Sequence, residues 1–131
     1  MRCDAHFHVF GPAERYPARD PKLRYPPPLA PLEGYRRLAR QLGLERFVFV
    51  QPSAYGRDNS CMLDAMQQTP HSRGIADVEE NAPDAELARL HDLGVRGVRI
   101  NVSPQDPTEG ARLSSEVLHA LAGETRRAEA A

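Results

Sequence analysis

Two histidines separated by one residue, His6 and His8, are the side chains near the start of the chain best suited to chemistry. With Asp4 they alternate along residues 2–9, a pattern that predicts a short strand. Alternate side chains of a strand lie about 7 Å apart on one face, so two imidazoles can reach one divalent metal ion. His8 ends the strand, where parallel α/β proteins carry active sites, which favours a site over ordinary core or surface histidines.

Polar side chains also lie at the ends of later predicted strands. Gln51 and Ser53 follow an apolar strand, and Arg99 shares one strand face with Asn101. An arginine inside a barrel is unfavourable unless it meets an anion, and a substrate carboxylate offers bidentate geometry. These residues therefore predict a site for a small carboxylated molecule.

The same residues have plainer interpretations that the sequence leaves open. Arg99 could pair with an internal acid such as Asp77, and Gln51 and Ser53 could simply cap a loop. Tyr25 lies in a proline-rich loop, and long loops in compact domains are often functional lids. It is predicted to contact substrate, with a surface contact as the alternative.

Strand and helix patterns alternate along the chain, which predicts βαβ units and a parallel sheet of the α/β class. The predicted strands cover residues 2–9, 46–51, 73–78 and 95–102. The predicted helices cover residues 32–42, 58–68, 83–93 and 113–121. A small flavodoxin-like domain is an alternative, disfavoured because no glycine-rich phosphate loop follows the first strand.

Helical spacing predicts which side chains of these helices face the core. The predicted inward residues are Tyr35, Leu38, Ala39, Leu42, Met62, Leu63, Met66, Leu87, Leu90 and Leu93. Gly43 is placed to end the first helix.

Composition excludes several classes of protein. The 131 residues correspond to one domain, and 17 basic against 18 acidic residues leave no excess for nucleic-acid binding. No apolar run reaches the roughly 18 residues that span a bilayer, and no signal pattern opens the chain, so we expect a cytoplasmic protein without membrane partners. Cys3 and Cys61 are expected to be reduced thiols.

Three segments resemble the amidohydrolase-related TIM-barrel metal-dependent hydrolases, and within them most resemble the 2-pyrone-4,6-dicarboxylate lactonases. The segments are Asp4-Ala5-His6-Phe7-His8-Val9-Phe10-Gly11-Pro12, Phe49-Val50-Gln51-Pro52-Ser53 and Gly94-Val95-Arg96-Gly97-Val98-Arg99-Ile100-Asn101. The resemblance implies a (β/α)8 barrel that hydrolyses a lactone, amide or related ester bond. Some relatives instead decarboxylate aromatic acids with a metal.

The resemblance also implies roles for individual residues. Positions matching His6 and His8 bind a divalent metal, commonly zinc, in the wider family. In the lactonase branch the metal is dispensable, and the two histidines hold and polarise the substrate. The position matching Arg99 grips a substrate carboxylate, and those matching Tyr25, Gln51 and Ser53 contact the substrate more loosely.

The chain departs from the family in extent. A complete barrel has eight βα units, about 250 residues, whereas four units are predicted here, the N-terminal half. We expect a partial barrel over residues 1–122, with the proline-rich loop at 12–31, and a frayed tail over residues 123–131. The family's later strand-end histidine and its general-base aspartate have no counterpart.

This departure predicts a truncated chain that is inactive by itself. A fragment, a frameshift product and a functional half-barrel are the interpretations left open. A non-catalytic remnant, or a half-barrel subunit that depends on a partner, is the alternative function. The exposed strand edges would invite a homodimer or a complementing C-terminal half.

Overall fold

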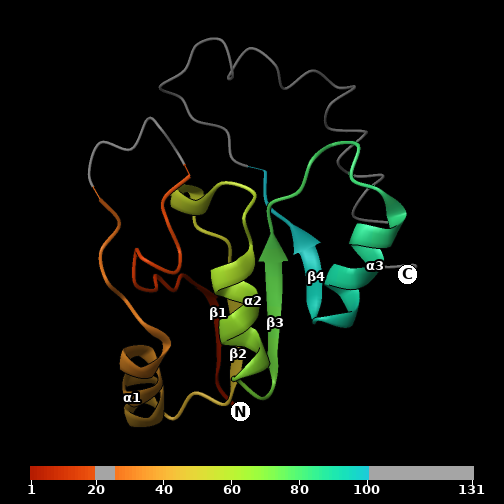
Figure 1. Cartoon of the computed structure of the whole chain (residues 1–131). Helices are drawn as coiled ribbons and strands as arrows, with labels where there is room; N and C mark the ends of the chain where they lie inside the picture. The colour runs from red at the N-terminus through yellow and green to blue at the C-terminus, as the bar shows by residue number, and fades with distance from the viewer. Residues whose placement is uncertain (20–25, 101–131) are drawn as a thin grey trace.

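Four parallel strands form one sheet in the order β1-β2-β3-β4 (Figure 1). The structure is a computed structural model that describes residues 1–19 and 26–100. Its strands are β1 (Cys3–Phe7), β2 (Arg46–Val50), β3 (Ser72–Ala76) and β4 (Val95–Val98). Its helices are α1 (Leu32–Leu42), the short 3-10 helix η1 (Ser53–Tyr55), α2 (Ser60–Gln67) and α3 (Asp84–Asp92). The predicted alternation of strand and helix is confirmed.

The strand order identifies the architecture. Each strand pairs with the one that follows it in the sequence, so the sheet always winds in one direction. A flavodoxin-like sheet has the order 2-1-3-4-5 and reverses direction at its switch point. The flavodoxin-like alternative is therefore excluded, and the described residues form a partial (β/α)8 barrel with four strands and the helices that connect them.

One face of the sheet is covered by the helices. Phe7 and Phe49 project from β1 and β2 into a core whose helical members include Met62, Met66 and Leu87. Figure 1 shows α2 lying across this face. All the residues predicted to face inward from α2 are buried, as are Leu87 and Leu90 of α3.

Gly74 of β3 shows how closely α2 approaches the sheet. A Cβ at this position would lie 2.6 Å from the Met66 sulfur, a distance that real contacts do not reach. Only glycine lets α2 pack at this depth without displacing Met66.

Helix α1 is covered less completely than predicted. Its bounds match the prediction, and Gly43 ends it with a φ of 65°. Ala39 is buried, but Leu38 and Leu42 are each 50% exposed, so their predicted burial is wrong. The reason is that α1 packs through Tyr35 beside the edge strand β1, where no further described element covers its other side.

Some predictions concern residues outside the described ranges. They include Tyr25, Asn101, the helix over residues 113–121 and the tail over residues 123–131. Cys3 and Cys61 are both free thiols, as expected. None of the described helices is long and apolar enough to cross a bilayer.

Candidate active site

Four polar residues each come directly after one of the four strands. His8 follows β1, Gln51 follows β2, Asp77 follows β3 and Arg99 follows β4. The carboxyl ends of parallel strands meet at one edge of a sheet, where α/β barrels carry their active sites. The chain therefore gathers an imidazole, an amide, a carboxylate and a guanidinium along this edge, which we call the strand-end edge.

His8 is fixed by the backbone of the neighbouring strand. Its Nδ1 lies 2.7 Å from the Val50 carbonyl oxygen. A carbonyl oxygen only accepts, so Nδ1 carries the proton and Nε2 keeps its lone pair. Burial lowers the pKa of His8, and the nearby charges of Arg99 and His6 lower it further. The neutral ring thus presents an acceptor nitrogen.

The imidazole ring of His6 lies close to that of His8. The two ring centroids are 5.2 Å apart and the ring planes meet at 80°. His6 is exposed, whereas His8 is half-buried. The structure therefore brings together the two histidines that the sequence singled out.

Asp4 does not share the face of the two histidines, so that prediction is wrong. One Asp4 carboxylate oxygen accepts a hydrogen bond from the Tyr35 hydroxyl at 2.8 Å, and the other accepts from the His6 backbone N–H at 3.1 Å. The Tyr35 ring also stacks on Phe7, with centroids 3.8 Å apart. Asp4 is therefore turned toward α1, on the helix-covered face.

A change of register in β1 explains this reversal. Asp4 pairs with Phe47, but Phe7 pairs with Phe49, so three steps on β1 match two on β2. The extra residue is a bulge, and a bulge breaks the alternation of side chains that the sequence prediction assumed.

Arg99 spans the strand-end edge from its far side. Its backbone N–H donates to the Ala76 carbonyl at 2.7 Å, and its Nη1 donates to the Gln51 carbonyl at 2.5 Å. The side chain therefore reaches across the end of β3 to the end of β2. The guanidinium is half-buried, as predicted for an arginine directed inward.

The sequence pointed to Asp77 only as an alternative ion-pair partner for Arg99. Its carboxylate lies 3.6 Å from the Arg57 guanidinium. Burial raises the pKa of Asp77, although the charges of Arg57 and Arg99 both lower it. The signal that could have identified it as a site residue is its place directly after β3, which the predicted strand over residues 73–78 obscured.

Gln51 and Ser53 occupy different environments. Gln51 is 1% exposed, and its Nε2 donates to the carbonyls of Gly56 and Asp58, each at 2.9 Å. Ser53 is exposed at the start of η1. The amide of Gln51 thus holds the loop after β2, and Ser53 lies on the surface of that loop.

Asn59 is a further buried amide, at the start of α2, whose side chain makes no hydrogen bond that caps the helix. Its side chain instead pairs with the backbone of Asp77, donating at 2.9 Å and accepting at 3.1 Å. It joins the loop after β2 to the end of β3. No feature of the linear sequence indicated this bridge.

His6 and His8 supply only part of a metal site. Catalytic zinc usually takes three protein ligands. Among residues 1–19 and 26–100 no group of three histidine, cysteine or acidic side chains could hold an ion. The two imidazoles are chemically suited to a divalent metal, but the described residues do not complete its coordination.

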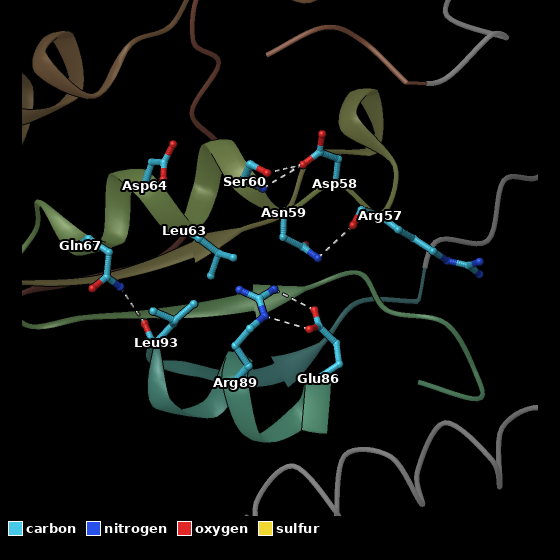
Figure 2. Close-up of a pocket in the computed structure, with 10 residues that line it drawn as sticks. All are labelled: Arg57, Asp58, Asn59, Ser60, Leu63, Asp64, Gln67, Glu86, Arg89 and Leu93. Atoms are coloured by element: carbon cyan, nitrogen blue, oxygen red, sulfur yellow. Dashed lines mark hydrogen bonds and ion pairs between the residues drawn. The ribbon is translucent and has the colours of Figure 1, made fainter. Parts of the chain in front are cut away.

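A groove of about 320 Å³ lies between α2 and α3 (Figure 2). Two of its charged side chains pair with each other, because Arg89 donates twice to Glu86 at 2.8 Å, and Asp58 accepts from the Ser60 backbone N–H. Because none of the four strand-end residues lines it, this groove is not the candidate active site.

Sequence comparison connects the chain to hydrolases. The profile of the amidohydrolase family matches residues 3–125. A 2-pyrone-4,6-dicarbaxylate hydrolase of Comamonas testosteroni is 44% identical over 99 residues, which are 75% of this chain and 32% of that protein. A 4-sulfomuconolactone hydrolase of Hydrogenophaga intermedia is 42% identical over 105 residues, 78% of this chain and 34% of that protein.

Structure comparison agrees. A crystal structure of a probable 2-pyrone-4,6-dicarboxylic acid hydrolase from Acinetobacter baumannii, with citric acid bound, matches with a TM-score of 0.71 and 27% identity. The match covers 94% of this chain and 46% of that chain. The chain spans about a third of the length of the curated relatives it matches. From the family profile, the matching strand order and these relatives, we conclude that the chain belongs to the amidohydrolase family.

Proposed function

We propose that the strand-end edge is one wall of a hydrolase site for a small carboxylated lactone or a related ester or amide. The observation that carries the proposal is the convergence of His8 and Arg99 on β2, through the adjacent carbonyls of Val50 and Gln51. This convergence brings a guanidinium that could bind a carboxylate near an imidazole whose Nε2 keeps its lone pair. The named substrates of the relatives, a pyrone dicarboxylate and a sulfomuconolactone, support this class of substrate.

Arg99 is proposed as the carboxylate anchor. Guanidinium groups bind carboxylates through two parallel hydrogen bonds, and Arg99 uses Nη1 on a backbone carbonyl that also fixes its direction. The citric acid bound by the Acinetobacter protein supports an acidic ligand at such a site. Ser53, Tyr25 and Asn101 are proposed as lesser substrate contacts.

The two histidines are proposed to divide their work. Neutral His8 accepts at Nε2, which suits a metal ligand or a proton acceptor, because its lowered pKa disfavours the protonated form. The exposed ring of His6 is free to approach a substrate carbonyl and polarise it. A divalent metal, when bound, would polarise the same carbonyl and activate water.

We also propose that hydrolysis requires barrel strands beyond the described four. The half-exposed Leu38 and Leu42 of α1 lie beside β1, whose outer edge pairs with no described strand. A complementing C-terminal half-barrel, or a second copy of the chain, would cover this side. Addition of a C-terminal half from a related hydrolase should then give turnover, whereas turnover by the purified chain as a monomer would contradict this requirement.

Calorimetric titration with 2-pyrone-4,6-dicarboxylate tests the carboxylate site. Arg99→Met should weaken binding about tenfold or more, since it removes a charge-assisted pair. Arg96→Met is the matched control, because Arg96 lies on β4, three residues before Arg99, but is exposed and hydrogen-bonded to the His91 and Val95 carbonyls. Equal binding by both variants, or no binding by the unaltered chain, would contradict the proposal.

A further inference from the structure

The side chain of Gln51 is committed to the protein rather than to the solvent. It is 1% exposed, and its amide nitrogen donates both hydrogens, to the carbonyls of Gly56 and Asp58. The reverse orientation of the amide would place its oxygen against two carbonyl oxygens, where it could accept nothing. The geometry therefore fixes which end of the amide faces the loop.

The loop that Gln51 holds folds back over the strand ends. It runs from Pro52 to Asn59 and includes η1. At its far end Asn59 pairs with the backbone of Asp77 after β3. The loop is thus tied at its beginning by one buried amide and at its end by another, and both ties lie at the strand-end edge.

The backbone of Gln51 links this loop to the two charged or polar groups of the proposed site. Its carbonyl accepts from Arg99 at 2.5 Å, and the preceding carbonyl, of Val50, accepts from His8 at 2.7 Å. Successive carbonyls of a strand point to opposite sides. The anchors of the imidazole and of the guanidinium are therefore two consecutive carbonyls on opposite sides of the strand.

We propose that Gln51 is a positioning residue that sets the placement of Arg99 relative to His8, rather than a loose substrate contact. Its amide fixes the loop, the loop fixes the rotation of the Gln51 peptide, and that peptide carries the carbonyl on which Arg99 rests. The buried Gln51 Oε1 accepts no hydrogen bond from the residues that the structure describes. The Gln51 amide thus makes two donor hydrogen bonds while its oxygen stays unpaired among the described residues. Burying an unpaired acceptor costs free energy, which an apolar side chain of similar shape would avoid.

This inference rests on the proposed carboxylate site, but NMR of the isotope-labelled full chain tests it separately. Gln51→Glu keeps the shape and removes both donors, and Gln51→Met removes the polar group altogether. Both should shift the Arg99 guanidinium signals and the His8 ring-nitrogen signals. The matched control is Gln67→Glu, the same change at an exposed glutamine on α2 that donates to the Leu93 carbonyl. It should leave both sets of signals in place.

Citrate binding provides the functional readout. Either Gln51 variant should raise the dissociation constant for citrate about tenfold. This loss of affinity corresponds to one or two positioned hydrogen bonds. Gln67→Glu should bind as the unaltered chain does. Failure of the unaltered chain to bind citrate would count against the carboxylate site alone, because the Arg99 and His8 signals still report on positioning.

A measurement on the unaltered chain keeps the inference testable if the variants unfold. The two side-chain amide protons of Gln51 should exchange with solvent much more slowly than those of Gln67. Equal exchange rates, or folded Gln51 variants whose Arg99 and His8 signals stay unchanged, would overturn the proposal.

Discussion

The helix-covered face and the strand-end edge use the same four strands in different ways. On the helix-covered face, Phe7, Phe49 and Met62 belong to a mainly apolar core. At the strand-end edge, one residue later along each strand, the side chains are polar and rest largely on backbone carbonyls and loop groups. The face stabilises the fold through burial, whereas the edge depends on where single hydrogen bonds point.

The difference shows how residues that stabilise the fold and residues that could do chemistry are separated within strands of four or five residues. Val50 ends β2, and its carbonyl is free for His8 because the ladder stops there. The strand end therefore supplies acceptors that a strand interior has already used. Substitutions on the face should change stability most, and substitutions at the edge should change binding with small effects on stability.

Phe49→Ala should have the largest effect on stability. Phe49 is fully buried and its ring lies 4.5 Å from that of Phe7, so truncation should cost roughly 3–5 kcal/mol of unfolding free energy. Urea unfolding followed by circular dichroism measures this loss. The control Val48→Ala, at a half-buried position on the same strand, should lose clearly less. Equal losses of unfolding free energy in the two variants would mean that burial on the helix-covered face is not the main source of the stability of the sheet.

Tyr35→Phe should have an intermediate effect, about 1 kcal/mol, because it removes one hydrogen bond and keeps the stacking on Phe7. It should also shift the backbone amide of His6, which donates to the same Asp4 carboxylate. Tyr16→Phe is the control, since Tyr16 donates to Asp64 instead. If both variants shift the His6 amide in an NMR spectrum, Asp4 does not link α1 to the histidine pair.

Asp77→Asn should have the smallest effect and the opposite sign. The raised pKa of Asp77 means that its protonated form stabilises the folded state below the unfolded pKa and that this stability is lost as pH rises through the folded pKa. The asparagine should therefore raise the unfolding free energy at pH 7, and the gain should vanish in acid. A loss at pH 7 would show that the Arg57 pair outweighs burial.

Much of the fold could be predicted from the sequence because hydrophobic periodicity reflects burial directly. The apolar run of β2 and the leucines of α3 identified their elements and inward faces. Leu38 and Leu42 misled because periodicity shows which helix face is apolar, not whether a neighbour covers it. Asp4 misled because a bulge changes which face a side chain joins without leaving a sign in the sequence.

The residues of the candidate site could be predicted where their position along a strand was enough to identify them. His8 and Gln51 lie where their predicted strands end, whereas Arg99 was identified by alternation within its predicted strand, although it follows β4 in the structure. The hydrogen bonds of Gln51 and Asn59 were not predictable, because they join backbone groups of loops whose paths depend on the whole sheet. The role of Asp77 was missed for a simpler reason, a strand boundary set two residues too late.

An NMR titration of the full chain with 2-pyrone-4,6-dicarboxylate tests the central claim most directly. The account predicts that backbone amide shifts concentrate at His8, Gln51 and Arg99, while Phe49 and Leu87 on the helix-covered face keep theirs. Shifts confined to the groove between α2 and α3, or no shifts at millimolar ligand, would contradict a carboxylate site at the strand-end edge.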